Sequence, residues 1–298
     1  MFHLSGPNKA PWFTHVFAVV LTILAYILGQ IPLLVVIVVK DVAIDDTSAI
    51  STAMIEQIGS NLFLALMLIP FVFALVTLLI CYKFLFKSEV ISALTTRPKL
   101  DWKRFFLSFS LWTFLLFGML VITFFKDGNL VWQFNSSTFL PLLLISLLLI
   151  PLQTTAEEVF FRGYLLQVAG FNLKKGIVAV LFTGVLFGVL HGSNPEVQAL
   201  GKIALLYYIS TGIFLGLLAV LDDGLELGMG YHAANNIFAS VIVTSEWQVF
   251  QTDALVMNKN AAVFGWENYI TLFFLQPLLL LLFSKVYRWK SWKSKLLN

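Results

Sequence analysis

The stretch TFLPLLLISLLLIPLQTTAEEVFFRGYLLQVA, residues 138–169, combines a long apolar run with two adjacent carboxylates and an arginine. If it is helical throughout, it extends about 48 Å, which exceeds the roughly 30 Å hydrocarbon core of a bilayer. Charged groups inside a membrane span are costly and usually functional. Glu157, Glu158 and Arg162 are therefore the first candidates for a functional site.

The composition of the whole chain is typical of a helical membrane protein. Of its 298 residues, 59% are hydrophobic and 12% are charged, and the mean hydropathy is +0.89. Soluble globular domains carry about 25% charged residues. A membrane β-barrel would show short alternating segments in place of the long apolar runs seen here. The sequence therefore predicts an all-α, polytopic transmembrane helical bundle.

We predict about eight transmembrane spans within a single membrane domain, residues 1–298. Basic residues cluster beside the spans, where topology explains them, and form no stripe that suggests a nucleic-acid partner. The acidic segment 40–57 and the basic segments 87–104 and 288–295 place both termini in the cytoplasm by the positive-inside rule. The expected spans lie near residues 12–39, 62–86, 104–125, 138–153, 176–192, 201–220, 228–244 and 268–287.

Residues 138–169 are too long for one straight span, so we expect a break within them. Pro151 offers a break or kink. Thr155 and Glu158 have the spacing of a capping box, which predicts the start of a second helix. Gly170 is the expected stop of that helix.

The two glutamates have different local partners. Glu158 stands four residues before Arg162, which is the favourable order for an ion pair on a helix. Glu157 points about 100° away from Glu158 and has no local cationic partner. One interpretation is that both carboxylates only cap a helix and complement its dipole. The alternative is that Glu157 acts as a general base, because an unpaired carboxylate in apolar surroundings suits that task.

Two of the four histidines interrupt apolar spans. The sequence FGVLHG places Phe187 and His191 on one face of the fifth span, and YHAANN places His232 and Asn236 one turn apart on the seventh. Any one of them alone would be explained by a hydrogen bond between membrane helices. Together with the glutamate pair they form a set suited to hydrolysis of a peptide bond. The fifth span also carries three glycines at four-residue spacing, which lets another helix approach closely: Gly184, Gly188 and Gly192.

These three motifs, in this order on successive spans, resemble the CPBP family of intramembrane peptidases, which are related to the type II CAAX prenyl endopeptidases. The matching residues are Glu157, Glu158, Arg162, Phe187, His191, His232 and Asn236. The resemblance covers about residues 138–245, which would form a CPBP-like catalytic core. The first three expected spans and the last one carry no motif.

The resemblance implies a role for each residue. Glu157 would activate a water molecule for attack on the scissile carbonyl, with His191 orienting or polarising that water. His232 and Asn236 would stabilise the oxyanion, a task for which imidazole and amide donors are suited. Glu158 and Arg162 would hold the helix and orient Glu157, and Phe187 would support the site.

Metal dependence is open at this point. Glu157, His191 and His232 are candidate ligands of a catalytic zinc ion, because two histidines and one carboxylate make a plausible three-ligand site. Against zinc, the sequence has no His-Glu-x-x-His helix, and Asn236 is a poor zinc ligand. We favour a water activated by glutamate without a bound cofactor.

The implied function is an intramembrane endopeptidase, a hydrolase acting on a membrane-embedded or lipidated protein or peptide within the lipid bilayer. An alternative is a catalytically silent protein of the same fold, serving bacteriocin immunity or scaffolding. A transporter with a proton-coupling carboxylate is a third class, but no inverted repeat supports it. Short loops and compact size favour a multi-pass protein of a bacterial inner or plasma membrane.

Overall fold

The computed structural model describes residues 7, 10–42, 50–127, 129–173 and 175–297. Helices dominate these ranges, and the predicted all-α polytopic membrane bundle is confirmed. The α-helices are α1 (Trp12–Gly29), α2 (Ile31–Val39), α3 (Ile50–Ile58), α4 (Ser60–Ile80), α5 (Trp102–Asp127), α6 (Ser136–Glu158), α7 (Leu166–Leu173), α8 (Gly176–Leu190), α9 (Pro195–Leu200), α10 (Ile203–Asp222), α11 (Glu226–Ile237), α12 (Trp266–Ile270), α13 (Gln276–Val286) and α14 (Trp292–Leu297).

Shorter turns extend or connect these helices. The turn η4 (Val90–Ala93) is a 3₁₀ helix, and the π-helical turns are η3 (Cys81–Leu85), η5 (Val159–Leu165), η6 (Phe238–Ile242) and η7 (Thr271–Leu275). Within the described ranges, six continuous helices are long and apolar enough to cross a membrane. The number of spans, about eight, and the cytoplasmic termini stay predictions. The six helices are Trp12–Val39, Ser60–Leu85, Trp102–Lys126, Ser136–Leu173, Ile203–Asp222 and Trp266–Val286.

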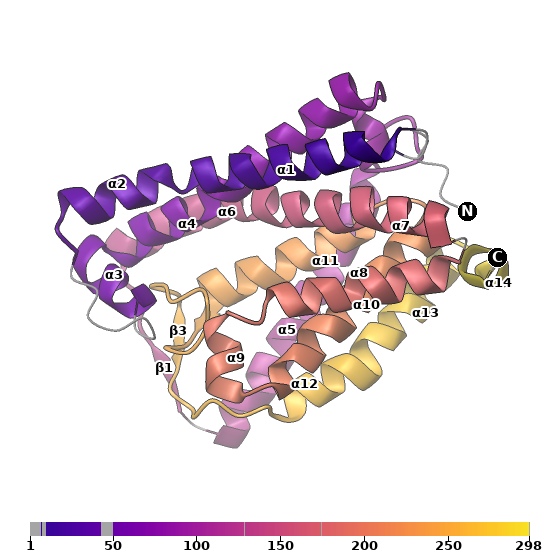
Figure 1. Cartoon of the computed structure of the whole chain (residues 1–298). Helices are drawn as coiled ribbons and strands as arrows, with labels where there is room; N and C mark the ends of the chain where they lie inside the picture. The colour runs from indigo at the N-terminus through magenta and orange to yellow at the C-terminus, as the bar shows by residue number, and fades with distance from the viewer. Residues whose placement is uncertain (1–6, 8–9, 43–49, 128, 174, 298) are drawn as a thin grey trace.

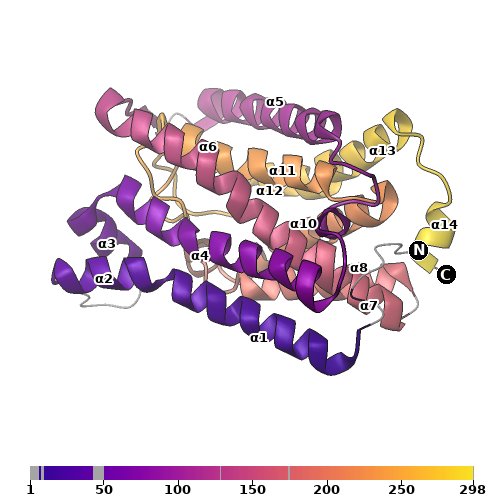
Figure 2. The same ribbon diagram turned by 90° about the horizontal axis from the view of Figure 1, so that it is seen from above.

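The helices pack in two layers. In one layer α1 packs against α4, α4 against α6, α6 against α11 and α11 against α5, which gives the row visible in Figure 2. In the second layer α8 and α10 pack closely against each other, with α13 beside α10 (Figure 1). The motif-bearing helices α6, α8 and α11 therefore meet in the interior, where the two layers face each other.

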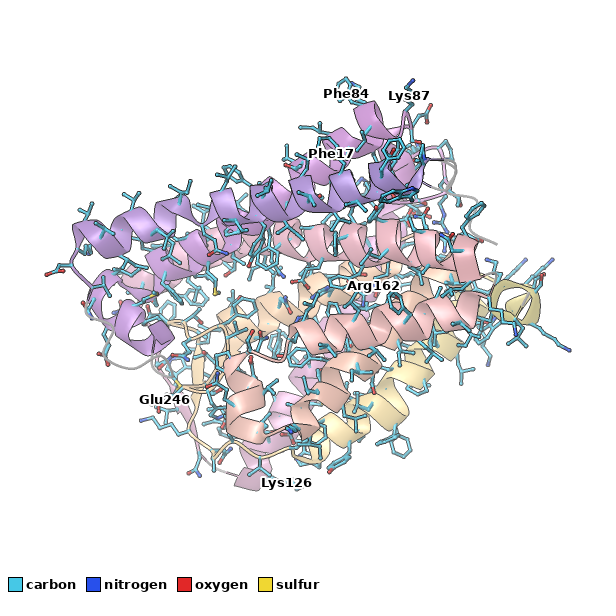
Figure 3. All side chains as sticks on the ribbon, viewed as in Figure 1. Phe17, Phe84, Lys87, Lys126, Arg162 and Glu246 are labelled. Carbon is cyan, nitrogen blue, oxygen red and sulfur yellow. The ribbon has the colours of Figure 1, made fainter. Side chains whose placement is uncertain are left out.

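Large apolar side chains cover much of the outer surface. Phe17 and Phe84 point outward in Figure 3 and are 54% and 68% exposed, and Phe125 on α5 is 81% exposed. Soluble monomers rarely expose contiguous apolar patches of this extent. In a polytopic membrane protein these side chains face lipid, so their exposure carries no cost.

The break expected at Pro151 is wrong. Residues Ser136–Leu173 form one continuous helix that passes through Pro151, and Thr155 lies inside it, where it starts no helix. Gly170 lies within α7, which continues to Leu173, so the expected stop at Gly170 is also wrong. The physical reason is the hydrogen-bond count. An interior proline removes one backbone hydrogen bond, whereas a helix end inside the membrane leaves up to four donors or four acceptors without partners.

The π-helical turn η5 follows the two glutamates directly. Such turns are uncommon and often lie at functional sites. Its Gly163 fits closely under the 3₁₀ turn η4, because a Cβ at this position would lie 2.3 Å from the carbonyl oxygen of Ala93. The Tyr82 hydroxyl donates to the Gly163 carbonyl at 2.6 Å. The turn is therefore held against η3 and η4 immediately after the carboxylates.

A small sheet lies at the end of the bundle opposite α14 (Figure 1), and the sequence analysis did not predict it. Its strand order is β1-β3-β2, with β1 (Leu130–Trp132) antiparallel to β3 (Val256–Asn258) and β2 (Val243–Thr244) parallel to β3. Strands this short carry too few residues for an alternating pattern to be recognised in the sequence.

The contact between α8 and α10 depends on glycine. A Cβ at Gly188 would lie 2.3 Å from Ile209 Cγ1 and 2.8 Å from the Ile209 nitrogen. At Gly184 a Cβ would similarly meet the backbone of Ile213. Gly192 lies beyond the end of α8. A Cβ at Gly192 would lie 2.9 Å from the carbonyl oxygen of Val189, which is in α8 and not in α10. The expected close helix approach is therefore present at the first two glycines but not at the third.

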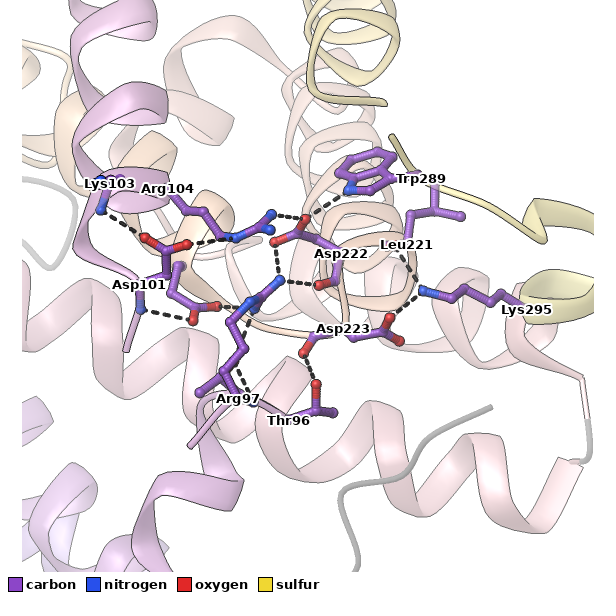
Figure 4. A network of polar contacts seen from close by, with 12 residues as sticks. Thr96, Arg97, Asp101, Lys103, Arg104, Leu221, Asp222, Asp223, Trp289 and Lys295 are labelled. Atoms are coloured by element: carbon purple, nitrogen blue, oxygen red, sulfur yellow. Dashed lines mark hydrogen bonds and ion pairs between the residues drawn. The ribbon is translucent and has the colours of Figure 1, made fainter. Parts of the chain in front are cut away.

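A buried ionic cluster joins the ends of several helices (Figure 4). Asp222 at the end of α10 pairs with Arg97 at 3.1 Å and with Arg104, and it accepts a hydrogen bond from Trp289 Nε1 at 2.7 Å. Glu226 at the start of α11 is fully buried and pairs with Arg97 at 3.0 Å. The cluster therefore fixes the junction of α10 and α11 against the start of α5, and ties the C-terminal segment to it.

We predict that Gly188→Ala lowers the thermal stability of the purified protein by about 1–3 kcal/mol, because overpacking a close helix contact forces the backbones apart. Gly118→Ala is the matched control, since nothing lies within 4 Å of a Cβ at Gly118. Melting in detergent measures both variants. Equal melting temperatures for the two would contradict a glycine-dependent contact.

Candidate active site

Glu157 and Glu158 end α6 and face different surroundings. Successive helical residues point about 100° apart. Glu158 is buried, at 1% exposure, whereas Glu157 lines a cavity of about 940 Å³. The two carboxylates are adjacent in the sequence but point to different sides of the helix, so packing gives them different surroundings.

Glu158 is paired with Arg162 inside the protein. Arg162 Nη1 donates to Glu158 Oε1 at 3.0 Å, which is the i, i+4 pair expected from the sequence. Arg162 Nη2 donates to the Gly212 carbonyl of α10 at 3.1 Å, and the guanidinium lies over the ring of Phe187 with Cζ 4.4 Å from the centroid. Figure 3 shows Arg162 between the helix layers. Phe187 therefore supports the site through the arginine.

His232 on α11 lies between the two carboxylates. Its Nδ1 is 2.9 Å from Glu158 Oε1, and its Nε2 is 3.6 Å from Glu157 Oε2. An ionised carboxylate only accepts hydrogen bonds, so Nδ1 is the nitrogen that carries a proton. Glu158 Oε1 is thus shared by Arg162 and His232.

Glu157 is held by a residue that the sequence analysis missed. Gln153 Nε2 donates to Glu157 Oε1 at 2.7 Å, and Gln153 Oε1 accepts from Asn236 Nδ2 at 3.1 Å. The expectation that Glu158 and Arg162 orient Glu157 is therefore not what the contacts show. A signal was present in the sequence, because Gln153 is a polar residue four positions before Glu157.

His191 follows the last residue of α8. Its Nδ1 lies 2.7 Å from the carbonyl oxygen of Phe187, so in the neutral ring Nδ1 donates and Nε2 is the acceptor. The ring lies 4.4 Å from that of Phe187, which agrees with their predicted common face, and it stacks on Tyr208 at 4.4 Å and 23°. His191 lines the same cavity as Glu157 and His232.

Polar and apolar residues line the cavity together. One wall is polar and carries Gln153, Glu157, His191, His232 and Asn236. Apolar residues of α1, α4 and α5 line other parts of it. These include Ile23, Met67, Leu68, Phe71, Leu78, Leu116, Met119 and Leu120.

The metal dependence of the three candidate ligands stays a prediction. In the part of the chain that the structure describes, no group of three or more His, Cys, Asp or Glu side chains is placed to hold a metal ion. Nδ1 of His232 faces Glu158 and Nδ1 of His191 faces the Phe187 carbonyl, so Nε2 is the nitrogen of each ring that remains for a ligand or for catalysis.

The structure brings the predicted site residues to one cavity wall. Glu157, His232 and Asn236 are joined by direct contacts or through Gln153. His191 shares their cavity. The remaining histidines lie elsewhere: His15 on α1 contacts the Tyr164 hydroxyl at 3.1 Å, and residue 3 lies outside the described ranges.

Comparisons with known proteins found a matching family model and a relative. Residues 136–238 match the family model described as type II CAAX prenyl endopeptidase Rce1-like. YyaK of Bacillus subtilis (strain 168), described as an uncharacterized protein, is 29% identical over 296 residues, which cover 97% of this chain and 95% of that protein. No solved structure matches the chain.

The matched segment contains every residue of the three motifs, from Glu157 on α6 to Asn236 on α11. It also contains Gln153, which joins the first motif to the last. The family resemblance expected from the sequence is confirmed, because residues 136–238 match the model of the Rce1-like type II CAAX prenyl endopeptidases.

Proposed function

We propose that this protein is an intramembrane endopeptidase in which Glu157 activates the attacking water. The observation that carries the proposal is the cavity wall on which Glu157, His232 and Asn236 meet across α6 and α11. The substrate is a membrane-embedded or lipidated protein or peptide, because apolar residues also line the cavity that carries this polar wall. Its site of action is a bacterial inner or plasma membrane.

Glu157 is suited to the role of general base. Its Oε1 is fixed by Gln153, while its Oε2 is buried and has no hydrogen-bond partner among the described residues. A general base must lie within hydrogen-bond reach of the proton that it removes. A water bound between Oε2 and the scissile carbonyl would complete the bonding of Glu157 and lose its proton to Oε2 on attack.

His232 is suited to stabilise negative charge. Glu158 holds the proton of Nδ1, so Nε2 donates a hydrogen bond when the ring is protonated. Two carboxylates face this ring, Glu158 at Nδ1 and Glu157 at Nε2. An imidazolium directed toward the cavity would stabilise the developing oxyanion.

Asn236 and His191 complete the arrangement. Asn236 uses one amide proton for Gln153, which leaves its second N–H for the oxyanion. The acceptor Nε2 of His191 would bind a proton of the attacking water and orient it toward the carbonyl. The Asn236 and His191 roles each use an atom for which the described residues provide no hydrogen-bond partner.

We predict that Glu157→Gln abolishes cleavage of a reporter peptide while the protein stays folded. Glutamine keeps an acceptor for Gln153 but cannot remove a proton from water. Glu89→Gln is the matched control, because Glu89 is exposed and lies outside the cavity. Turnover and melting temperature of the purified proteins are measured. Turnover by Glu157→Gln at the wild-type rate would exclude the proposed base, and no cleavage by any variant would favour an immunity or scaffold role.

We predict that Arg162→Ala and Glu158→Gln both lower stability, by about 3–5 kcal/mol for the arginine, because removing one partner leaves the other charge buried and unpaired. Lys103→Ala is the control for the arginine, since Lys103 is an exposed cation at the start of α5. Thermal melting in detergent is the measurement. Unchanged melting temperatures for both site variants would show that the pair does not stabilise the fold.

Zinc content distinguishes a water activated by Glu157 from a water activated by a metal ion. We expect the purified protein to contain less than one equivalent of zinc and to keep its activity in a strong chelator, because the water is activated by Glu157 alone. Elemental analysis and activity before and after chelation are the measurements. Stoichiometric zinc that is lost together with activity in His191→Ala and His232→Ala would overturn metal-free activation and leave the peptidase assignment standing.

A further inference from the structure

A second carboxylate, Glu196 on α9, lines the cavity beside the candidate active site. Its Oε1 accepts a hydrogen bond from the backbone nitrogen of Val249 at 2.8 Å, which joins α9 to the loop after β2. Its Oε2 is buried and has no hydrogen-bond partner among the residues that the structure describes. One oxygen of Glu196 is therefore structural, and the carboxylate has no cationic partner among the described residues.

Gln248 presents a second acceptor on the loop that binds Glu196. It precedes Val249, lines the same cavity, and its Oε1 is buried without a hydrogen-bond partner in the described part of the chain. Burial raises the pKa of the Glu196 carboxyl, while the Val249 amide and the Tyr208 hydroxyl oppose this shift. Buried acceptors without donors are costly, and a donor-rich ligand would remove that cost for both residues.

The two acceptors lie close to the candidate active site. The Tyr208 hydroxyl, which favours the charged form of Glu196, accepts a hydrogen bond from Asn194 Nδ2 at 3.2 Å. The ring of Tyr208 stacks on His191. A single aromatic side chain therefore separates Glu196 from a residue proposed to orient the attacking water.

The charge of the cavity indicates the kind of donor. Its described lining contains three glutamates and no lysine or arginine. A neutral donor would leave the carboxylate charge uncompensated, whereas an ammonium or guanidinium group forms stronger, charge-assisted hydrogen bonds with a carboxylate. A cation therefore fits this position better than a hydroxyl or an amide.

We propose that Glu196 and Gln248 form a subsite that binds the lysine or arginine side chain of a peptide substrate. A role of this subsite in substrate binding rests on the proposed peptidase function, whereas binding of the cation does not. The subsite adds a specificity-determining contact to a cavity that apolar residues also line.

Binding is tested without catalysis, in the Glu157→Gln background. The probes are Nα-acetyl-lysine amide and its uncharged isostere Nα-acetyl-norleucine amide, and the readout is the saturable change in melting temperature. We expect the lysine probe to stabilise the protein and the norleucine probe not to. Adding Glu196→Gln should abolish the shift, because the glutamine keeps an acceptor for Val249 but loses the charge. Adding Glu246→Gln should preserve it, because Glu246 is an exposed carboxylate on the same loop (Figure 3).

Specificity is tested on any peptide that the wild-type protein cleaves. Lysine and norleucine are compared at each position flanking the scissile bond. We expect lysine at one position to lower KM about tenfold or more, with little change in kcat. Glu196→Gln should remove this preference and Glu246→Gln should retain it. Equal KM values for the two peptides at every position would overturn the subsite.

The two proposals can fail separately. A lysine-specific melting shift that requires Glu196, in a protein that cleaves no peptide, supports the cation site and contradicts the peptidase. Cleavage that depends on Glu157, without a lysine-specific shift, supports the peptidase and overturns the cation site. A shift that survives Glu196→Gln also overturns it, because the cation then binds elsewhere.

Discussion

The buried guanidinium of Arg162 is the group on which the rest of the structure depends. Removing one partner of a buried ion pair costs about 3–5 kcal/mol, so the fold must bring a carboxylate and further acceptors to this point. Glu158 comes from the same helix, the Gly212 carbonyl comes from α10, and His232 on α11 binds the same carboxylate. One buried charge therefore fixes the relative positions of three helices that build the cavity wall.

Close packing of the two layers makes this arrangement possible. Gly212 reaches Arg162 on the side of α10 that packs against α8, where a Cβ at Gly212 would lie 2.8 Å from the Gly184 carbonyl. At the other end of α11, Glu226 is held in the buried ionic cluster. Because both ends of the motif-bearing region are fixed, the position of His232 against the carboxylates follows from the packing of α11.

The two adjacent glutamates illustrate how packing assigns different chemistry to identical side chains. Glu158 Oε1 faces the Arg162 guanidinium and the His232 ring, and Glu158 does not line the cavity. Glu157 lines the cavity and is held through Oε1 by the uncharged amide of Gln153. A carboxylate beside a buried cation stabilises the fold, whereas one beside a cavity and without a cationic neighbour on its own helix is placed to accept a proton.

The sequence by itself determined the membrane class, the apolar helices, the Glu158–Arg162 pair and the three family motifs, because these depend on composition and on spacing within one helix. Tertiary structure alone decided that the long helix continues through Pro151, that Glu158 turns to His232, and that Gln153 links Glu157 to α11. Contacts between helices depend on how each helix is rotated and how deeply it lies against its neighbours. A periodic pattern gives the face of a helix, but only the packed bundle decides which side chain that face meets.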